Sequence, residues 1–291
     1  MDYPIYLVFR AFVLLFRFIP FRLLYGFADL IYYLVYYIIG YRKKVVFTNL
    51  QNSYPGKSKQ EITVIAKGFY HHFADMLIES MKAFNMSEEE VVRRYKFKNT
   101  AFLDEFYQQG RQIICVAGHY GNWEWAGIAS GTQLRHKPVG FYKPLSNKFI
   151  DRYIQQTRVR GRSRLASILK TAETFRTDWG EPSIFYMVAD QSPSSARLAF
   201  WVNFMNQDTA TLHGPEKYAR LFDLPVVIAS ARPVKRGYYE VEFKLLEPEP
   251  LKTKTGEITG RYMQMLEELI NENPQYYLWS HRRWKLSRVT S

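Results

Sequence analysis

Three short apolar runs, each followed by a glycine or a polar residue, most constrain the fold of this chain. They cover residues 113–117, 184–189 and 226–229. Continuous apolar runs of this length are typical of strands that are buried on both faces. Segments with helical spacing lie between them. The alternation predicts an α/β fold with a mixed, mostly parallel sheet flanked by helices.

Capping signals mark where several of these helices begin. Ser58 with Glu61 forms a capping box ahead of an amphipathic segment, and Ser87 with Glu90 repeats the pattern. A last helix is predicted at about 259–272, because Pro274 follows it.

Four further elements are predicted from spacing and composition. Residues 139–142 are expected to form a strand, and Ser146 is expected to cap the helix that follows it. Apolar residues at helical spacing predict another helix over 165–175. Apolar and charged residues alternate over 239–245, which is typical of an edge strand with one solvated face.

The first 44 residues differ from the rest and are predicted to form a membrane anchor, ahead of a catalytic domain over 45–291. Residues 23–39 are almost wholly apolar but include Asp29, and a bilayer span needs about 20 apolar residues. Three arrangements fit: one spanning helix, a helical hairpin lying in the membrane interface, or two buried helices of a soluble domain. Basic residues flank the segment at Arg10, Arg17, Arg42, Lys43 and Lys44.

Charge and cysteine content limit the classes of partner. Forty basic residues against 27 acidic ones give a formal net charge of +13, which favours nucleic acid, anionic lipid or an acidic protein as partner. No nucleic-acid-binding module is recognisable, and we expect no nucleic acid as partner. Cys115 is the only cysteine, so an intramolecular disulfide is excluded, and its apolar neighbours predict a buried core residue.

The histidines do not have the spacing of metal ligands. His71 and His72 are adjacent within a predicted helix, so one of them must face away from any shared site. His136 and His213 stand apart, and His281 is expected to make a structural hydrogen bond. We therefore expect neither a metal nor another cofactor.

The segment from Gly118 to Glu124 carries the clearest chemical signal. It follows the first apolar run directly, and ligands bind at the carboxyl ends of strands in open α/β sheets. Glycines flank His119 and permit a tight turn, and Glu124 could fold back onto the imidazole at the start of the next helix. An ordinary turn histidine would show the same pattern.

No serine or cysteine nucleophile is placed beside this pair. A histidine base with a carboxylate partner then favours direct attack by a hydroxyl of the acceptor over a covalent enzyme intermediate.

The His-x4-Glu pair resembles the His-x4-Asp/Glu motif of the lysophospholipid acyltransferase superfamily. Further blocks are similar to one branch, the bacterial lipid A biosynthesis (lauroyl/myristoyl) acyltransferases. The resemblance covers nearly the whole chain, and its most specific part is the C-terminal segment Gln-Tyr-Tyr-Leu-Trp-Ser-His-Arg-Arg. The other blocks are Phe141-Tyr142-Lys143-Pro144 with Asn147, Val188-Ala189-Asp190-Gln191, and 203–220.

The resemblance implies roles for individual residues. His119 would be the general base and Glu124 its charge partner. Lys143 and Asp190 would be further site residues, although the family usually has arginine at the first position and a strand-end aspartate can instead cap a helix. Asn122 and Arg282 would join them in binding substrate.

The resemblance also implies an activity and a location. The fold would be like that of glycerol-phosphate acyltransferases, with the catalytic domain on the cytoplasmic face of a bacterial inner membrane. An acyl chain would pass from acyl carrier protein or acyl-CoA to a hydroxyl of a lipid A precursor. A lysophospholipid or a monoacylated amino-acid lipid is an alternative acceptor, and a non-catalytic lipid-binding protein is an alternative of another class.

The basic residues and the oxyanion complete these expectations. Basic clusters at 152–164 and 282–288 would suit an acidic carrier protein, a phosphorylated headgroup or an anionic membrane surface, or they form a solvated face. Backbone amides near Gly121, or the Lys143 ammonium, are candidates for stabilising the oxyanion.

Overall fold

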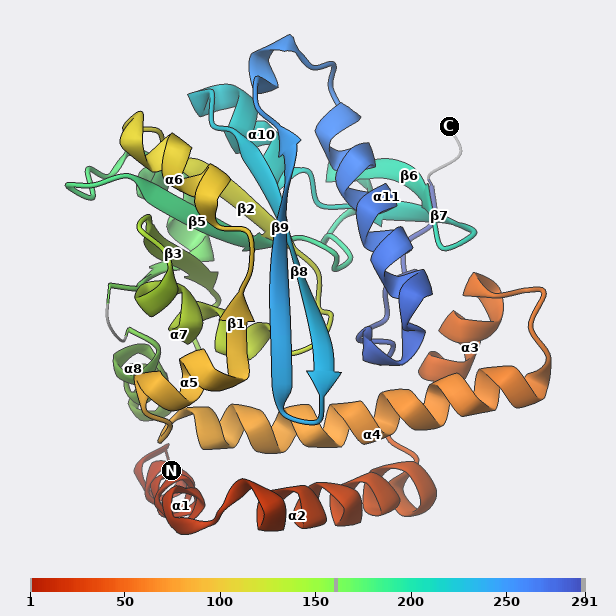
Figure 1. The fold of residues 1–291 in the computed structure, drawn as a ribbon. Helices are drawn as coiled ribbons and strands as arrows, with labels where there is room; N and C mark the ends of the chain where they lie inside the picture. The colour runs from red at the N-terminus through yellow and green to blue at the C-terminus, as the bar shows by residue number, and fades with distance from the viewer. Residues whose placement is uncertain (1, 160–161, 289–291) are drawn as a thin grey trace.

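A computed structural model describes residues 2–159 and 162–288 and has a seven-stranded sheet at its centre (Figure 1). Within the described residues, β8–β9 is the only antiparallel neighbour pair of this sheet, which confirms the predicted mixed, mostly parallel α/β architecture. Its strands, in spatial order, are β1 (Tyr95–Phe97), β9 (Tyr238–Glu247), β8 (Val226–Lys235), β2 (Ile113–Ala117), β5 (Ser183–Val188), β3 (Lys137–Tyr142) and β4 (Arg164–Ser167).

Helices cover both faces of the sheet. One face packs against α5 (Glu88–Arg94), α6 (Ala101–Gln108) and α7 (Trp123–Gln133). The opposite face packs against α9 (Thr171–Arg176), α10 (Gly214–Phe222) and α11 (Glu257–Glu272). A separate hairpin of β6 (Phe200–Phe204) and β7 (Gln207–Thr211) lies beside α11.

The three apolar runs form the central strands because both of their faces are buried. In β2, Ile113 and Cys115 pack on the α7 face, whereas Ile114 and Val116 pack on the α11 face. Cys115 is fully buried, as predicted, and burial raises the pKa of its thiol.

The long helix α4 (Lys59–Ala83) crosses beneath one edge of the sheet (Figure 1). The predicted capping box is present, because Ser58 Oγ accepts from the Glu61 amide and Glu61 accepts from the Ser58 amide. Ser87 likewise caps α5 through the Glu90 amide. Each such N-cap typically stabilises a helix by about 1 kcal/mol.

Three local predictions were wrong. Leu165 belongs to β4, which pairs with β3, so the helix predicted over 165–175 begins only at Thr171. Strand β9 is not at the edge, because the short β1 pairs with its outer side. The cap of α8 (Lys148–Arg158) is Asn147 rather than Ser146, since the Asn147 side chain accepts from two amides of the first turn.

The N-terminal segment forms two helices that lie against the outer side of α4 (Figure 1). They are α1 (Asp2–Phe18) and α2 (Phe21–Tyr33), and a π-helical turn (Leu34–Ile39) prolongs α2. Among the described residues, Phe21–Ile39 is the one helical stretch long and apolar enough to cross a membrane, judged by length and composition. Helix α3 (Lys43–Ser53) then starts beside the predicted domain boundary, which stays a prediction.

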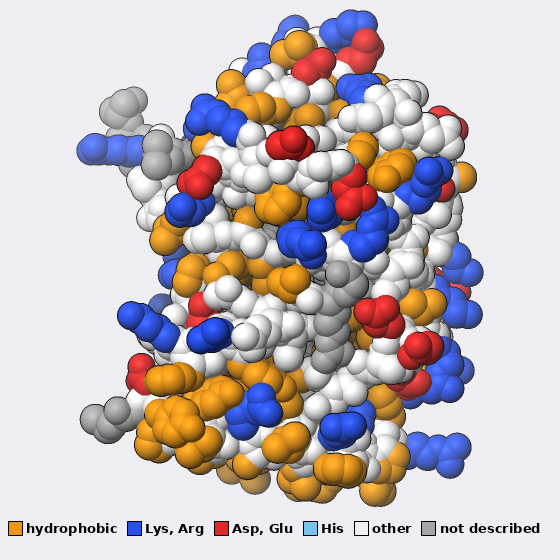
Figure 2. Space-filling model, turned by 90° about the vertical axis from the view of Figure 1, so that its left-hand side faces the viewer, with side chains coloured by type: hydrophobic (Ala, Val, Ile, Leu, Met, Phe, Trp, Pro, Cys, Tyr) orange, Lys and Arg blue, Asp and Glu red, His pale blue; other side chains and the backbone are white. Residues whose placement is uncertain are grey.

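The outer side of these two helices is apolar and exposed. Phe18, Leu30 and Ile38 are 79%, 65% and 77% exposed. Figure 2 shows hydrophobic side chains gathered at this lower end of the molecule, with Lys and Arg side chains among them. So large an exposed apolar surface indicates contact with a membrane or another apolar partner.

Candidate active site

His119 and Asp190 meet because their strands are neighbours. Strands β2 and β5 pair in parallel with Ala117 opposite Val188, so the residues that follow both strands emerge at one edge of the sheet. His119 Nδ1 lies 2.6 Å from Asp190 Oδ1, and the His119 amide donates to Asp190 Oδ2 at 2.9 Å. The aspartate therefore holds both the ring and the backbone of His119.

The turn after β2 is held by the C-terminal segment. The Gly121 amide donates to the Tyr276 carbonyl oxygen at 3.1 Å, and the Leu278 amide donates to the His119 carbonyl oxygen at 3.1 Å. Gly121 has a φ of +61°, and a Cβ there would lie 2.6 Å from the Ala231 carbonyl oxygen. Only glycine fits this position without strain.

The pKa values of this pair favour an ion-pair-like couple. Burial alone would lower the pKa of His119, but the charge and hydrogen bond of Asp190, helped by the Glu124 charge, raise it above its ordinary value. Burial would raise the pKa of Asp190, but His119 and the Arg283 charge hold it below its ordinary value. Asp190 is thus the ionised acceptor of a hydrogen bond from Nδ1–H.

The second ring nitrogen of His119 is the atom that can accept a proton. When Nδ1 carries the hydrogen donated to Asp190, Nε2 has a lone pair. Gln191 Nε2 lies 3.1 Å from this atom. The Trp123 ring packs edge to face on the imidazole, with 4.9 Å between the ring centroids. Neither residue was predicted, although Gln191 directly follows Asp190 at the strand end.

Glu124 lies in the first turn of α7 and lines the same cavity as His119. Its charge acts on His119, but the carboxylate hydrogen-bonded to the ring is Asp190. The pairing of His119 with Glu124 stays a prediction, and we assign the orienting role to Asp190.

The remaining predicted residues are placed differently from one another. Lys143 is exposed at the end of β3 and lines the cavity. Asn122 is fully buried, and its side chain caps α7, which gives it a structural role. Arg282 is exposed, whereas its neighbour Arg283 is buried near Asp190. Sequence reasoning chose between two adjacent arginines without a signal that separates them.

Arg283 and His281 have buried nitrogen atoms without hydrogen-bond partners in the described part of the chain. These are Nε and Nη2 of Arg283 and Nδ1 of His281. Burial lowers the pKa of His281 to about 4, so its ring is neutral at pH 7. The expected structural hydrogen bonds of His281 are made by its backbone instead, with Leu278 and Asn49.

A cavity of about 700 Å³ opens beside His119. This volume is within the usual range of small-molecule sites, about 300–1,000 Å³. Its lining includes Tyr95, Phe97, Val241 and Phe243 from the far strands β1 and β9. A mainly apolar cavity of this size suits a ligand with a hydrocarbon chain.

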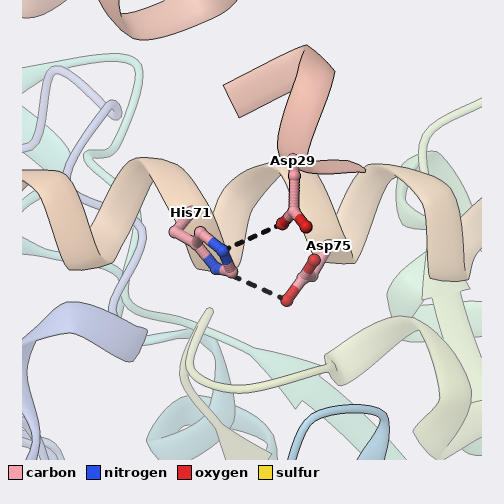
Figure 3. Close-up of side chains that lie close together, drawn as sticks. All are labelled: Asp29, His71 and Asp75. Atoms are coloured by element: carbon pink, nitrogen blue, oxygen red, sulfur yellow. Dashed lines mark ion pairs between the residues drawn. The ribbon is translucent and has the colours of Figure 1, made fainter. Parts of the chain in front are cut away.

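One cluster away from the cavity has the composition of a metal site. Asp29 of α2 and His71 and Asp75 of α4 bring their ligand atoms within 4.8 Å of one another (Figure 3). Arg236 Nη2 lies 2.6 Å from Asp29 Oδ1 and 2.5 Å from Asp75 Oδ1. Because the guanidinium already supplies the positive charge, we interpret the cluster as an ion-pair link between α2, α4 and the β8–β9 hairpin.

His119 is held by Asp190 and lines a mainly apolar cavity, and a histidine–carboxylate pair of this kind can act as a general base. Comparison with known proteins identifies the class of protein. The chain belongs to the bacterial lipid A biosynthesis acyltransferase family, whose model matches residues 1–286. It is therefore an acyltransferase.

Characterised relatives are distant but cover most of the chain. The lipid A biosynthesis lauroyltransferase of Escherichia coli (strain K12) is 25% identical over 84% of this chain and 79% of its own length. The palmitoleoyltransferase of the same organism is 22% identical over 85% and 80%, respectively. A lipid A biosynthesis acyltransferase of Haemophilus influenzae is 24% identical over 92% and 83%.

Proposed function

We propose that this protein transfers a fatty acyl chain from a thioester to a hydroxyl group of a lipid A precursor, with His119 as general base. The observation that carries the proposal is that His119, held by Asp190, lines the apolar cavity. The family membership and the activities for which the relatives are named support the acceptor class.

The reaction needs a proton acceptor and a stabilised oxyanion. The acceptor hydroxyl gives its proton to His119 Nε2 while its oxygen attacks the thioester carbonyl carbon. The tetrahedral intermediate then collapses, the carbon–sulfur bond breaks, and the imidazolium returns the proton to the leaving thiolate. Asp190 and Glu124 stabilise the imidazolium by their negative charges.

The group that stabilises the oxyanion, a hydrogen-bond donor or a cation, must be one that is not already bonded within the fold. Among the backbone amides near Gly121, that of Gly121 itself is already bonded to the Tyr276 carbonyl oxygen and that of Tyr120 to the Gly118 carbonyl oxygen. Lys143 lines the cavity, and its ammonium can meet either the oxyanion or a phosphate of the acceptor. We assign Lys143 this electrostatic role, with Arg282 as an exposed contact for an anionic headgroup.

The donor is proposed to be acyl carrier protein or acyl-CoA, both of which present an acidic or phosphorylated group. Arg164 lines the cavity at the end of the basic cluster 152–164. Arg160 of this cluster lies outside the described residues. The second basic cluster, 282–288, follows the segment whose Tyr276 and Leu278 bond to the His119 turn.

A test of this function offers each donor with each acceptor. Radiolabelled lauroyl or myristoyl thioesters of acyl carrier protein and of coenzyme A are supplied with a lipid A precursor, a lysophospholipid or a monoacylated amino-acid lipid. Label on the lipid A precursor is expected. Label on another acceptor would mean that the proposed substrate class is wrong but the acyl-transfer reaction is right. Label on none of the acceptors would favour a lipid-binding protein.

A variant of Lys143 separates its two possible roles. Lys143→Ala should mainly raise KM for a phosphorylated acceptor if the ammonium binds phosphate, and mainly lower kcat if it serves the oxyanion. Lys143→Arg keeps the charge and is the matched control.

We further propose that the anchor lies in the interface of a bacterial inner membrane, on the cytoplasmic side, and does not cross the bilayer. Helix α2 with its π-helical turn is long enough to cross a bilayer, so its polar contacts rather than its length carry this proposal. One side of it also carries polar groups bonded to the catalytic domain, Tyr25 to Glu79 and Asp29 to Arg236. If α2 crossed the bilayer, these polar groups would lie in hydrocarbon without the partners that satisfy them.

Cysteine labelling distinguishes the two arrangements. Arg22→Cys and Lys44→Cys place exposed thiols at the two ends of the apolar stretch, while the native Cys115 is buried and serves as an unlabelled background. In inverted membrane vesicles, a membrane-impermeant maleimide should label both variants from the same side. Labelling of the two positions from opposite sides would show that the helix spans the membrane.

A further inference from the structure

Helix α4 contacts the His119 turn through two buried polar side chains. His72 Nε2 lies 3.2 Å from the Gly121 carbonyl oxygen, and Glu79 Oε2 lies 2.7 Å from Asn122 Nδ2. The two residues are seven positions apart, about two helical turns, so they share one face of α4. The long helix thus holds two consecutive residues of the turn.

Glu79 is a carboxylate with no exposed surface and three hydrogen-bond donors around it. Tyr25 Oη donates to Oε1 at 2.8 Å, and Tyr239 Oη donates to Oε2 at 2.7 Å, beside the Asn122 amide. Burial raises the pKa of Glu79 to about 7 although the hydrogen bonds lower it. Burying a carboxyl group is costly unless hydrogen bonds satisfy it, and these three donors do so.

Asn122 uses both ends of its side-chain amide. Its Oδ1 accepts from the Trp125 amide at 3.1 Å and so caps α7, while its Nδ2 donates to Glu79. The Trp125 indole also donates to the Glu79 carbonyl oxygen at 3.1 Å. Glu79 therefore fixes the start of α7, between His119 and Glu124.

We propose that Glu79 is a positioning residue for acyl transfer, which orients the His119–Glu124 turn by accepting the hydrogen bond of Asn122. Through Tyr25, the same carboxylate joins that turn to the membrane-facing helix α2. The proposal rests on the proposed function. Neither Glu79 nor His72 lines the cavity, so both act through the backbone and side chains they hold.

A reciprocal pair of substitutions tests the bond. Asn122→Asp keeps the cap of α7 but sets a second carboxylate against Glu79. It is expected to lower kcat on the order of 10- to 100-fold, because small displacements of catalytic groups have effects of this size, and to leave KM within about twofold. Adding Glu79→Gln supplies a donor to the new carboxylate at position 122 and should restore kcat to within about threefold of wild type.

Two further variants control for folding. Asn122→Ser retains a capping oxygen, but its side chain is too short to reach Glu79, so it should also lower kcat. It replaces Asn122→Asp as the test variant if Asn122→Asp does not fold. Asn206→Asp is the matched control, because its side-chain amide donates to the Ser53 carbonyl oxygen and neither residue lines the cavity. It should leave kcat unchanged.

Amide exchange provides a measurement that does not depend on activity. Asn122→Asp should speed exchange over residues 119–127 and leave β5 protected, and Glu79→Gln should reverse the change. If wild type transfers no acyl group to any acceptor, the proposed function fails while this measurement still decides the role of Glu79. Unchanged exchange and kcat in Asn122→Asp, or no rescue by Glu79→Gln, would overturn the proposal.

Discussion

His119→Ala is expected to lower kcat for acyl transfer on the order of 10³-fold, the usual range for loss of a positioned general base being about 10²–10⁴. The imidazole lines the cavity, its Nδ1 is engaged by Asp190, and its Nε2 can take a hydroxyl proton once the acceptor displaces the Gln191 amide. KM should change little, because alanine removes no part of the apolar lining. The measurement is steady-state transfer of labelled acyl chain in detergent micelles.

The matched control is a buried histidine elsewhere in the fold. His136 bonds to the Arg111 carbonyl oxygen and does not line the cavity, so His136→Ala should cost stability but keep kcat. Full activity in His119→Ala would disprove the mechanism, even if lipid A precursors are acylated.

Asp190→Asn is expected to lower kcat by about 10²- to 10⁴-fold and to move the acid limb of the pH profile to lower pH. The base must be neutral to act, so activity rises as pH rises through the pKa of His119. Asp190 raises that pKa above its ordinary value of 6.5, and an amide in its place removes the charge. The profile of kcat/KM between about pH 5 and 9 measures the shift.

Glu124→Gln is the companion variant, because it tests the partner predicted from the motif. The Glu124 charge also raises the pKa of His119, but less than Asp190 does. The acid limb of the pH profile should therefore move to lower pH by a smaller amount. A larger shift in Glu124→Gln than in Asp190→Asn would restore Glu124 as the principal partner. An acid limb that stays fixed in both variants would mean that another group is the base.

The central fold followed from the sequence because burial on both faces leaves a simple signature. Residues 113–117 are all apolar because α7 covers one face of the strand and α11 covers the other. Leu165 was predicted to be helical because its spacing to the next apolar residues fits a helix. It lies in a strand because β4 pairs with β3, and the periodicity of a sequence does not reveal such a long-range contact. The short β1 was missed for the same reason, and with it the inner position of β9.

The site was predicted in part. His119 was found because glycines flank it after a buried strand, but the spacing to Glu124 drew attention to a partner nearby in sequence. Asp190 lies 71 residues away and reaches His119 only because β2 and β5 are neighbours in the sheet. Two apolar runs that end in Gly-His and Asp-Gln carried a usable signal, since parallel neighbours deliver both ends to one edge.

The links between the anchor and the rest of the chain have a consequence for biogenesis. Asp29 is paired by Arg236, 207 residues later, and Arg42 donates to the Ser280 carbonyl, 238 residues later. During synthesis the first helices leave the ribosome long before these partners exist, so among the described residues only His71 of the early helix α4 is then available to pair with Asp29. These two links therefore form only after the β8–β9 hairpin and the C-terminal segment have been synthesised, and a chain cut short before the hairpin would lack the ion pair that joins α2 to it.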